Sequence, residues 1–264
     1  MDLGLKGRRA LVTGSTAGIG FATARALAAE GADVIVNGRT QARVDAALGL
    51  LRAELPGARL SGVAADVGTA EGCERIVAAA PALDVLVNNA GVFAPIPFER
   101  ITDQDWKGIF EVNVLSGIRL ARAYVGGMRE RGWGRIVFVS SESALQIPAE
   151  MIHYGVTKTA QLAVARGLAE SLAGTGVTVN SVLPGPTRSE GVGGFIGQLA
   201  RTRGVDEAVV EREFFETARP SSLLRRFEEP DEIAAMIAYV CGAPASGTTG
   251  ASLRVDGGVV RSIA

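Results

Sequence analysis

Two residues of this sequence, Tyr154 and Lys158, have the types and the spacing that proton transfer requires. They are four positions apart in a segment that predicts a helix beginning near Ile152, and this spacing places both side chains on one helical face. A free tyrosine titrates near pH ~10, but a nearby ammonium favours the phenolate and lowers this pKa. A lowering of about three units needs roughly 4 kcal/mol, which a poorly solvated charge pair can supply. A tyrosine and a lysine at this spacing also occur together by chance, so other motifs must support the pair.

A glycine-rich turn follows the first predicted strand, Ala10-Leu11-Val12, and reads Thr13-Gly14-Ser15-Thr16-Ala17-Gly18-Ile19-Gly20. Glycines let the backbone bend sharply and approach a pyrophosphate, and the start of the next helix offers unpaired N–H groups to the anion. The spacing is G-x-x-x-G-x-G, which differs from the common G-x-G-x-x-G, and such turns also serve plain packing. Its place after the first strand of a βαβ unit favours a dinucleotide phosphate site.

The end of the second predicted strand indicates which dinucleotide binds. An acidic residue there would accept a hydrogen bond from a ribose 2′-hydroxyl. The strand instead ends Val36-Asn37-Gly38-Arg39-Thr40, and its one carboxylate, Asp33, stands at the start. Arg39 could pair with a 2′-phosphate through two hydrogen bonds, or it could simply lie in solvent at the strand end. We expect NADP(H) in preference to NAD(H), although Ser15, Thr16 and Ala17 add no second basic residue.

Strand-like apolar runs alternate with helix-length segments along the whole chain. Alternation of this kind predicts βαβ units and a parallel sheet, and near-continuous apolar runs are typical of strands buried on both faces. We therefore expect one α/β domain over residues 1–264, a Rossmann-type doubly wound sheet of about seven strands with helices on both faces. The runs lie at Ala10–Val12, Val34–Val36, Leu60–Ala65, Val85–Val87, Ile136–Val139, Val177–Leu183 and Leu253–Val255.

The alternation breaks once, between Thr187 and about Glu229, where no strand is predicted. Glycines stand at positions 191, 193 and 194, and a mixed-charge stretch follows from Arg201 to Arg226. A connection of this length in a compact domain is usually functional or mobile. We expect residues of about 188–228 to form a substrate lid. The alternative is a surface excursion that only packs on the core.

The composition excludes several classes of function. The 264 residues carry 27 basic and 28 acidic side chains, a net charge of -1, so nothing favours nucleic-acid or anionic-membrane binding. The apolar runs are far shorter than a membrane span, and no signal-peptide pattern opens the chain. Cys73 and Cys241 are far apart and form no metal-ligand pattern, so we expect no metal site and a reduced, cytoplasmic setting.

Taken together and in order, these motifs resemble the short-chain dehydrogenase/reductase family over almost the whole chain. The resemblance rests on Thr13-Gly14-x-x-x-Gly18-x-Gly20, Asp66-Val67, Asn88-Asn89-Ala90-Gly91, Asn113, Ser140-Ser141, Tyr154-x-x-x-Lys158, Pro184-Gly185-Pro186-Thr187 and Asp256-Gly257-Gly258. It implies an NAD(P)-dependent oxidoreductase that acts on a carbonyl or a secondary alcohol.

The resemblance implies four catalytic residues. Tyr154 would exchange a proton with the substrate oxygen, and Lys158 would bind the nicotinamide ribose and lower the pKa of Tyr154. Ser141, thirteen residues before Tyr154, would polarise the substrate carbonyl in preference to Ser140. Asn113 would hold a water that links Lys158 to solvent. The cofactor supplies the hydride, whereas the protein supplies position and the proton.

The resemblance also implies the remaining cofactor contacts. Asp66 and Val67 would flank the adenine, and the segment from Asn88 to Gly91, with Asn89 and Ala90, would pass beneath the ribose. Thr187, after Pro184 and Gly185, would contact the carboxamide or the phosphates. His153 adjoins Tyr154, but adjacent helical residues point in different directions, and a packing or pocket role is the better interpretation. Trp106 and Trp133 are interpreted as packing residues.

Two other functions compete with this hypothesis. A non-catalytic, cofactor-binding regulatory protein could use the same fold, because fold does not establish activity. An epimerase or dehydratase relative would usually have a longer substrate region and another glycine spacing. Intact Tyr154, Lys158 and Ser141 favour an enzyme.

The substrate is not identified by the sequence. The residues expected to line its pocket indicate a partly apolar site with a carboxylate near the edge; they are Phe93, Glu142, Leu145, Ile147, Met151 and Phe195. We expect a small-molecule substrate and a homo-oligomer, a tetramer in preference to a dimer, as is usual in the family.

Overall fold

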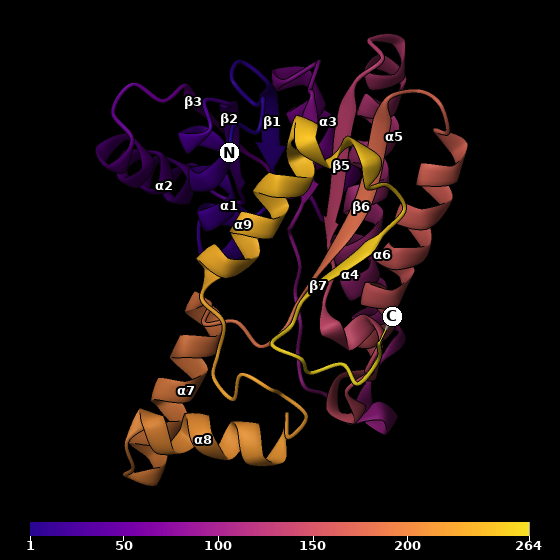
Figure 1. The fold of residues 1–264 in the computed structure, drawn as a ribbon. Coiled ribbons are helices and arrows are strands. Elements are labelled where there is room, and N and C mark those ends of the chain that lie inside the picture. Colours follow the sequence, from indigo (N-terminus) through magenta and orange to yellow (C-terminus); the bar gives the residue numbers. More distant parts are fainter. Residues whose placement is uncertain (264) are drawn as a thin grey trace.

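The computed structural model of the protein describes residues 1–263, except for the side chains of Glu190 and Phe195. In this part of the chain seven parallel strands form one sheet in the order β3-β2-β1-β4-β5-β6-β7 (Figure 1). The strands are β1 Arg9–Val12, β2 Asp33–Gly38, β3 Leu60–Ala64, β4 Val85–Asn88, β5 Gly134–Val139, β6 Val177–Pro184 and β7 Ser252–Val255. The order reverses between β1 and β4, so the predicted doubly wound sheet is confirmed and its ligand-binding edge lies at the carboxyl ends of these strands.

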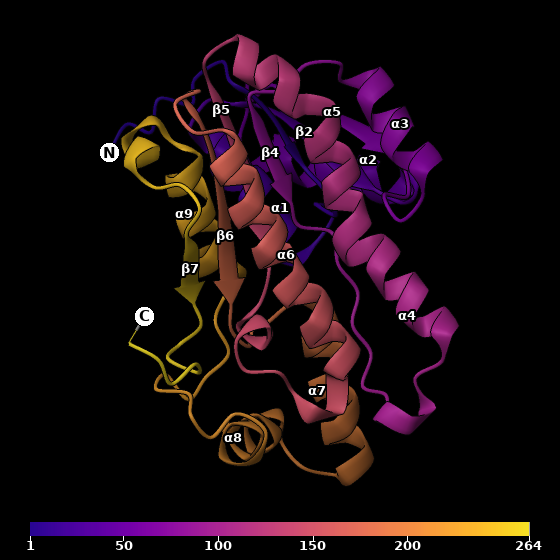
Figure 2. The ribbon, with the colours of Figure 1, turned by 90° about the vertical axis from the view of Figure 1, so that its right-hand side faces the viewer.

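Alternate residues of each strand face opposite helical layers. Val12 and Val36 pack on one side with α1 (Gly18–Ala29), α2 (Gln41–Glu54) and α9 (Pro230–Cys241). Leu11 and Ile35 pack on the other side with α3 (Ala70–Ala79), α5 (Ser116–Glu130) and α6 (Ile152–Ser171). Figure 2 shows α5 and α6 in front of the sheet and α1 and α9 behind it. Because both faces are covered, the strands are apolar nearly throughout, and the sequence could predict them.

One long helical stretch is interrupted. The helix α4 (Asp103–Phe110) does not continue directly into α5, because a wider helical turn at Glu111–Leu115 separates them. Such a turn shifts the register of the following side chains, and in proteins it often marks a functional position. Asn113 lies inside it.

The predicted lid segment contains two helices, α7 (Glu190–Arg203) and α8 (Glu207–Thr217), which extend beyond the carboxyl ends of the strands (Figure 1). Side chains of Ser189 and Asp206 cap their first turns, and Gly204, at a φ of 64°, ends α7. The helices form a small core of their own with Ile196, Ala200, Val210, Phe215 and Phe227. The prediction that no strand lies here is confirmed, but the segment is largely helical.

No helix among residues 1–263 is both long and apolar enough to cross a membrane. The thiols of Cys73 and Cys241 are buried and unpaired.

Candidate active site

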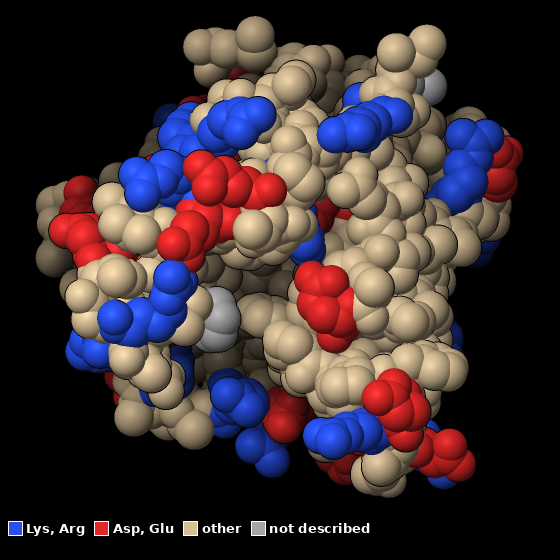
Figure 3. All heavy atoms as spheres, turned by 90° about the horizontal axis from the view of Figure 1, so that it is seen from below, with Lys and Arg blue, Asp and Glu red and all other residues tan. Residues whose placement is uncertain are grey.

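The candidate active site lies at the edge where the strands end. Figure 3 views the molecule from this end and shows a hollow between the lid side and the body of the domain, bordered by charged side chains of both signs. Tyr154 stands in the first turn of α6, and Lys158 follows one turn later. The helix thus presents both groups toward the ends of β4 and β5.

Lys158 is almost fully buried, with 3% of its surface exposed. Its Nζ donates hydrogen bonds to the Val139 carbonyl oxygen at 3.0 Å and to Gln161 Oε1 at 3.3 Å. Neither acceptor carries a charge, so burial lowers the pKa of Lys158 to about 8. The ammonium lies 5.5 Å from the centre of the Tyr154 ring.

The pKa of Tyr154 moves in the direction opposite to the one expected from the sequence. Burial raises the pKa of the phenol, and the negative charge of Glu142 raises it further. A hydrogen bond with Ser141 and the positive charge of Arg219 lower it, but they do not outweigh burial. The sequence argument considered the nearby lysine and omitted desolvation of the phenol, which is the larger effect here.

The two neighbouring serines have different surroundings. Ser140 Oγ donates to the Lys158 carbonyl oxygen at 2.8 Å, which ties β5 to α6. Ser141 is the serine that contacts Tyr154, and its hydroxyl donates to Glu142 Oε2. Ser140 is therefore a packing residue, and the geometry favours Ser141 for contact with a substrate oxygen.

Asn113 is connected to Lys158 through a residue that the sequence analysis did not identify. The Asn113 side chain is engaged with the backbone of Val92, at 2.8 and 2.9 Å, and with Thr157 Oγ1 at 3.0 Å. The backbone carbonyl oxygen of Asn113 accepts a hydrogen bond from Gln161 Nε2 at 2.6 Å, and Gln161 Oε1 accepts one from Lys158 Nζ. Gln161 thus bonds to both the Asn113 backbone and Lys158; only its position three residues after Lys158, on the same helical face, could have indicated it.

The glycine-rich turn is shaped by side chains that bond inside the protein. Ser15 Oγ donates to the Val12 carbonyl oxygen at 2.7 Å and accepts from the Asn37 amide. Thr13 Oγ1 accepts hydrogen bonds from the amides of Asn89 and Ala90, each at 3.0 Å. Thr13 and Ser15 therefore hold the turn, and their polar side-chain atoms already have partners.

The start of α1 fits a phosphate group. Its N-cap residue, Ala17, provides no side-chain hydrogen bond, and the first turn contains no acidic residue, so the first amides remain available. Gly14 and Gly18 adopt the left-handed φ values of 61° and 55°. A Cβ on Gly20 would lie 2.4 Å from the Gly14 carbonyl oxygen and 2.5 Å from Asn89 Nδ2. Only glycine fits there, and the close backbone approach forms a narrow cradle in front of the free amides of α1.

The other predicted cofactor residues surround this cradle. Arg39 is exposed directly after β2 and makes no ion pair in the described part of the chain. Asp66 is exposed, whereas Val67 is buried. A Cβ on Gly91 would lie 3.4 Å from Lys158 Nζ, so the segment after β4 passes directly over the lysine.

The segment that follows β6 is held from both sides. Pro184 ends β6, and the Gly185 amide donates to the Val255 carbonyl oxygen at 2.8 Å and to Glu228 Oε2 at 3.1 Å. Thr187 is buried, and its hydroxyl donates to the Gly185 carbonyl oxygen at 3.0 Å. These contacts hold the start of the predicted lid segment beside the carboxyl ends of the strands.

Apolar side chains form the rim of the expected substrate pocket. Phe93 meets the Tyr154 ring edge-on at 6.0 Å, and Leu145 and Ile147 are about half exposed. His153 is buried against Trp106, with ring centres 5.9 Å apart, as expected for a packing residue. The Phe195 side chain, also expected in the pocket, lies outside the described part of the structure.

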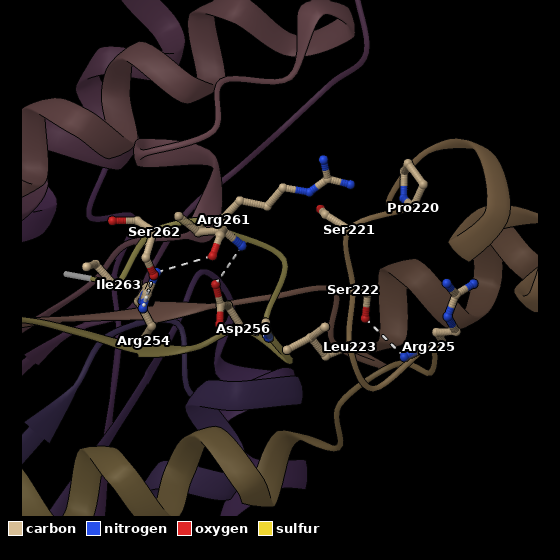
Figure 4. Close-up of a pocket in the computed structure, with 12 residues that line it drawn as sticks. Pro220, Ser221, Ser222, Leu223, Arg225, Arg254, Asp256, Arg261, Ser262 and Ile263 are labelled. Atoms are coloured by element: carbon tan, nitrogen blue, oxygen red, sulfur yellow. Dashed lines mark hydrogen bonds between the residues drawn. The ribbon is translucent and has the colours of Figure 1, made fainter.

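A further cavity lies away from Tyr154. It measures about 580 Å³ and lies between the segment after α8 and the C-terminal tail (Figure 4). Arg261 extends across it toward Ser221, and Arg254 turns back to donate to the tail carbonyls of Val260 and Ser262. The guanidinium groups of Arg254 and Arg261 point apart, so the cavity does not form a converging anion site. Among residues 1–263, no group of three or more metal-ligating side chains gathers.

Comparisons with known proteins agree with this geometry. The family model for short chain dehydrogenase matches residues 8–195. The chain is 44% identical over 263 residues, covering 100% of both proteins, to "Uncharacterized oxidoreductase YvaG" of Bacillus subtilis (strain 168). The structure superimposes on L-sorbose reductase from Gluconobacter frateurii in complex with NADPH and L-sorbose with a TM-score of 0.94, 31% identity and full coverage of both chains. It also matches a variant of actinorhodin polyketide ketoreductase with NADPH, at a TM-score of 0.87 and 32% identity over 97% of this chain and 98% of that one.

Proposed function

Since this chain belongs to the short-chain dehydrogenase/reductase family and is an NAD(P)-dependent enzyme of that family, we propose that it transfers a hydride between NADP(H) and a carbonyl or secondary alcohol, with Tyr154 as general acid and base. One observation carries the proposal. Tyr154 contacts Ser141 and lies beside the buried ammonium of Lys158, at the strand ends where the phosphate cradle also opens. This arrangement can deliver a proton to an oxygen that is held next to a dinucleotide.

Each residue has a separate task in the proposed reaction. When bound, the cofactor supplies or accepts the hydride. Tyr154 donates a proton to the substrate oxygen during reduction and takes it back during oxidation, while Ser141 donates a hydrogen bond to the charge that develops there. Lys158, a compact ammonium whose present acceptors are neutral, would hold the cofactor ribose hydroxyls. Asn113 and Gln161 keep the lysine in place.

We propose NADP(H) as the preferred cofactor because of Arg39. Its guanidinium lies at the end of β2 without an ion-pair partner among the described residues, and it can bind a 2′-phosphate through two hydrogen bonds. L-sorbose reductase and the polyketide ketoreductase, both reductases, were solved with NADPH. These two proteins support the proposal only as relatives.

For the substrate we propose a small ketone with hydroxyl groups. Glu142 and Arg219 lie next to Ser141 and Tyr154, so hydrogen-bonding groups of both kinds stand beside the reacting position. Phe93 and Leu145 form an apolar rim around them, and a hydroxylated ketone suits this mixture. L-sorbose, with which L-sorbose reductase was solved in complex, is such a compound.

A substrate screen tests the proposal. We expect hydroxylated ketones to be reduced with NADPH, and the corresponding alcohols to be oxidised with NADP⁺, faster than simple aliphatic ketones of the same length. If NADPH binds but no ketone or alcohol in a broad panel is turned over with either cofactor, the regulatory alternative would replace this function.

Three further expectations remain proposals. We propose that residues of about 188–228 form a lid, that the protein is a homo-oligomer, most often a tetramer in this family, and that it works in the cytoplasm. Hydrogen exchange of the lid with and without cofactor and light scattering at micromolar concentration test the first two.

A further inference from the structure

Two ion pairs of one arginine join the proposed lid to the loop between β5 and α6. Arg219, just after α8, donates through Nε to Glu142 Oε1 at 3.1 Å, across 77 positions of sequence. Glu142 directly follows Ser141 and opens a short turn, η3 (Glu142–Ala144). A second contact joins Arg219 Nη1 to Glu150 Oε1 at 3.4 Å. Both contacts end on the loop between β5 and α6, which carries the serine and leads to Tyr154.

The same carboxylate determines the direction of the Ser141 hydroxyl. Glu142 Oε2 accepts hydrogen bonds from Ser141 Oγ, from the Ser143 amide at 2.8 Å and from Ser143 Oγ at 3.1 Å. A carboxylate only accepts, so Ser141 must be the donor in this contact. The Ser141 oxygen in turn accepts from the Ser143 amide at 3.1 Å. Glu142 therefore holds the single Ser141 proton in this structure, and the hydroxyl must turn from Glu142 Oε2 to donate to a substrate oxygen.

Burial makes this pair different from the other ion pairs of the lid. The side chains of Arg219 and Glu142 are only 11% and 6% exposed. The pairs Arg203–Glu213 and Arg226–Glu232 are more than a third exposed on each side, and they stay within the lid segment or join it to α9. Exposed pairs contribute little, but loss of one partner from a buried pair leaves an uncompensated charge.

We propose that Glu142 and Arg219 form a latch that holds the lid against the catalytic loop and orients the Ser141 hydroxyl. Both are positioning residues for the proposed reaction, and this inference rests on the proposed function. When the pair is intact, lid closure and serine orientation depend on one carboxylate. Opening the lid would withdraw Arg219 and leave Glu142 with only its hydrogen bonds to Ser141 and Ser143.

The two partners have opposite electrostatic effects on Tyr154. Glu142 raises the pKa of the phenol, whereas Arg219 lowers it. The other charged groups nearby are Lys158, 5.5 Å from the ring centre, and Glu150, which is half exposed and bound to Arg219. His153, on the same helix, packs against Trp106. Removing Glu142 should therefore lower the pKa of Tyr154, whereas removing Arg219 should raise it.

The test compares Arg219→Met and Glu142→Gln with a control, Arg203→Met, which removes an exposed ion pair within the lid. In the cofactor-free protein, we expect amide exchange in residues 190–217 to become at least about tenfold faster in both latch variants, as loss of a charged hydrogen bond predicts, and to stay unchanged in the control. The pH at which alcohol oxidation reaches half its maximum should rise in Arg219→Met and fall in Glu142→Gln. The substrate KM should rise in both.

Unchanged lid exchange in both latch variants would overturn the proposal, as would a loss of activity with the same pH profile in both. If Arg219→Met fails to fold, Arg219→Lys keeps the charge but loses the two-point contact, and it should show the faster lid exchange with a smaller shift of the pH profile. The exchange measurement needs no substrate. It would therefore still support the latch if the proposed reaction proved wrong. A substrate panel without turnover, together with faster lid exchange in both latch variants, would count against the proposed reaction alone.

Discussion

The cofactor cradle and the proton-transfer end of the site are built in different ways. At the cradle, Thr13, Ser15 and Asn37 have their polar atoms bonded to neighbouring backbone, and the close contacts involve glycine and neutral groups. At the other end, Lys158, Glu142 and Arg219 are buried charged groups, and one of them comes from the lid. We therefore expect the cradle to be rigid and formed before ligands bind, whereas the proposed proton-transfer end should depend on charges whose balance changes with pH and, as proposed, with the position of the lid.

The strictest test of the rigid cradle is Gly20→Ala. The new Cβ would lie 2.4 Å from the Gly14 carbonyl oxygen and 2.9 Å from Ser15 Cα, both backbone atoms that cannot move without widening the turn. We expect a loss of about 1–3 kcal/mol of folding stability and loss of detectable NADPH binding. Denaturant unfolding and fluorescence titration measure the two effects.

Gly49→Ala is the matched control. Gly49 lies in α2 with nothing within 4 Å of its Cβ position, so alanine should stabilise the helix by about 0.5–1 kcal/mol. Equal loss of NADPH binding in the two variants would contradict the account of the cradle.

Lys158→Met tests the cost of burying charge at the proton-transfer end. Burial lowers the pKa of Lys158 from 10.5 to about 8, so the unfolded chain binds more protons between these pH values and stability rises with pH through this window. Below pH 8 Lys158 is charged in both the folded and the unfolded protein, so the folded protein carries the full free-energy cost of burying this charge. We expect the variant to lose turnover but to be more stable at pH 7 by up to about 3 kcal/mol.

The gain in stability should shrink as the pH approaches 10.5, which denaturation curves at pH 7 and pH 10 would show. A variant that is less stable than the wild type at both pH values would mean that the lysine contributes more by its hydrogen bonds than it costs by burial.

Arg39→Ala should have the smallest effect, because Arg39 is an exposed side chain at the edge of the cradle. Loss of a charge-assisted contact predicts roughly 10- to 100-fold weaker NADPH binding and little change for NADH. Titration of both cofactors measures it. If the two affinities fall together, Arg39 contributes to the shape of the site and not to the choice of cofactor.

The sequence predicted the strands and the glycine-rich turn well, and the surroundings of Tyr154 only in part. Strands buried on both faces produce apolar runs, and the glycine turn follows directly in sequence, so local patterns were sufficient. The helices α7 and α8 were missed because Gly193 and Gly194 weaken the helical pattern of α7, whereas their stability comes from a small core that includes Phe215 and Phe227. Long-range partners left no local pattern: Arg219 reaches Glu142 across 77 positions, and desolvation of Tyr154 depends on the packed fold.

The central claim is that Tyr154 transfers the proton, and Tyr154→Phe tests it most directly on a substrate found in the screen. The change removes the phenolic hydroxyl and keeps the ring that packs against Phe93. Single-turnover rates and NADPH titration should show a loss of roughly 100- to 10,000-fold in rate, the usual contribution of general acid–base catalysis, with cofactor affinity close to that of the wild type. A Tyr154→Phe protein that turns over at nearly the wild-type rate would contradict the assignment of the proton donor.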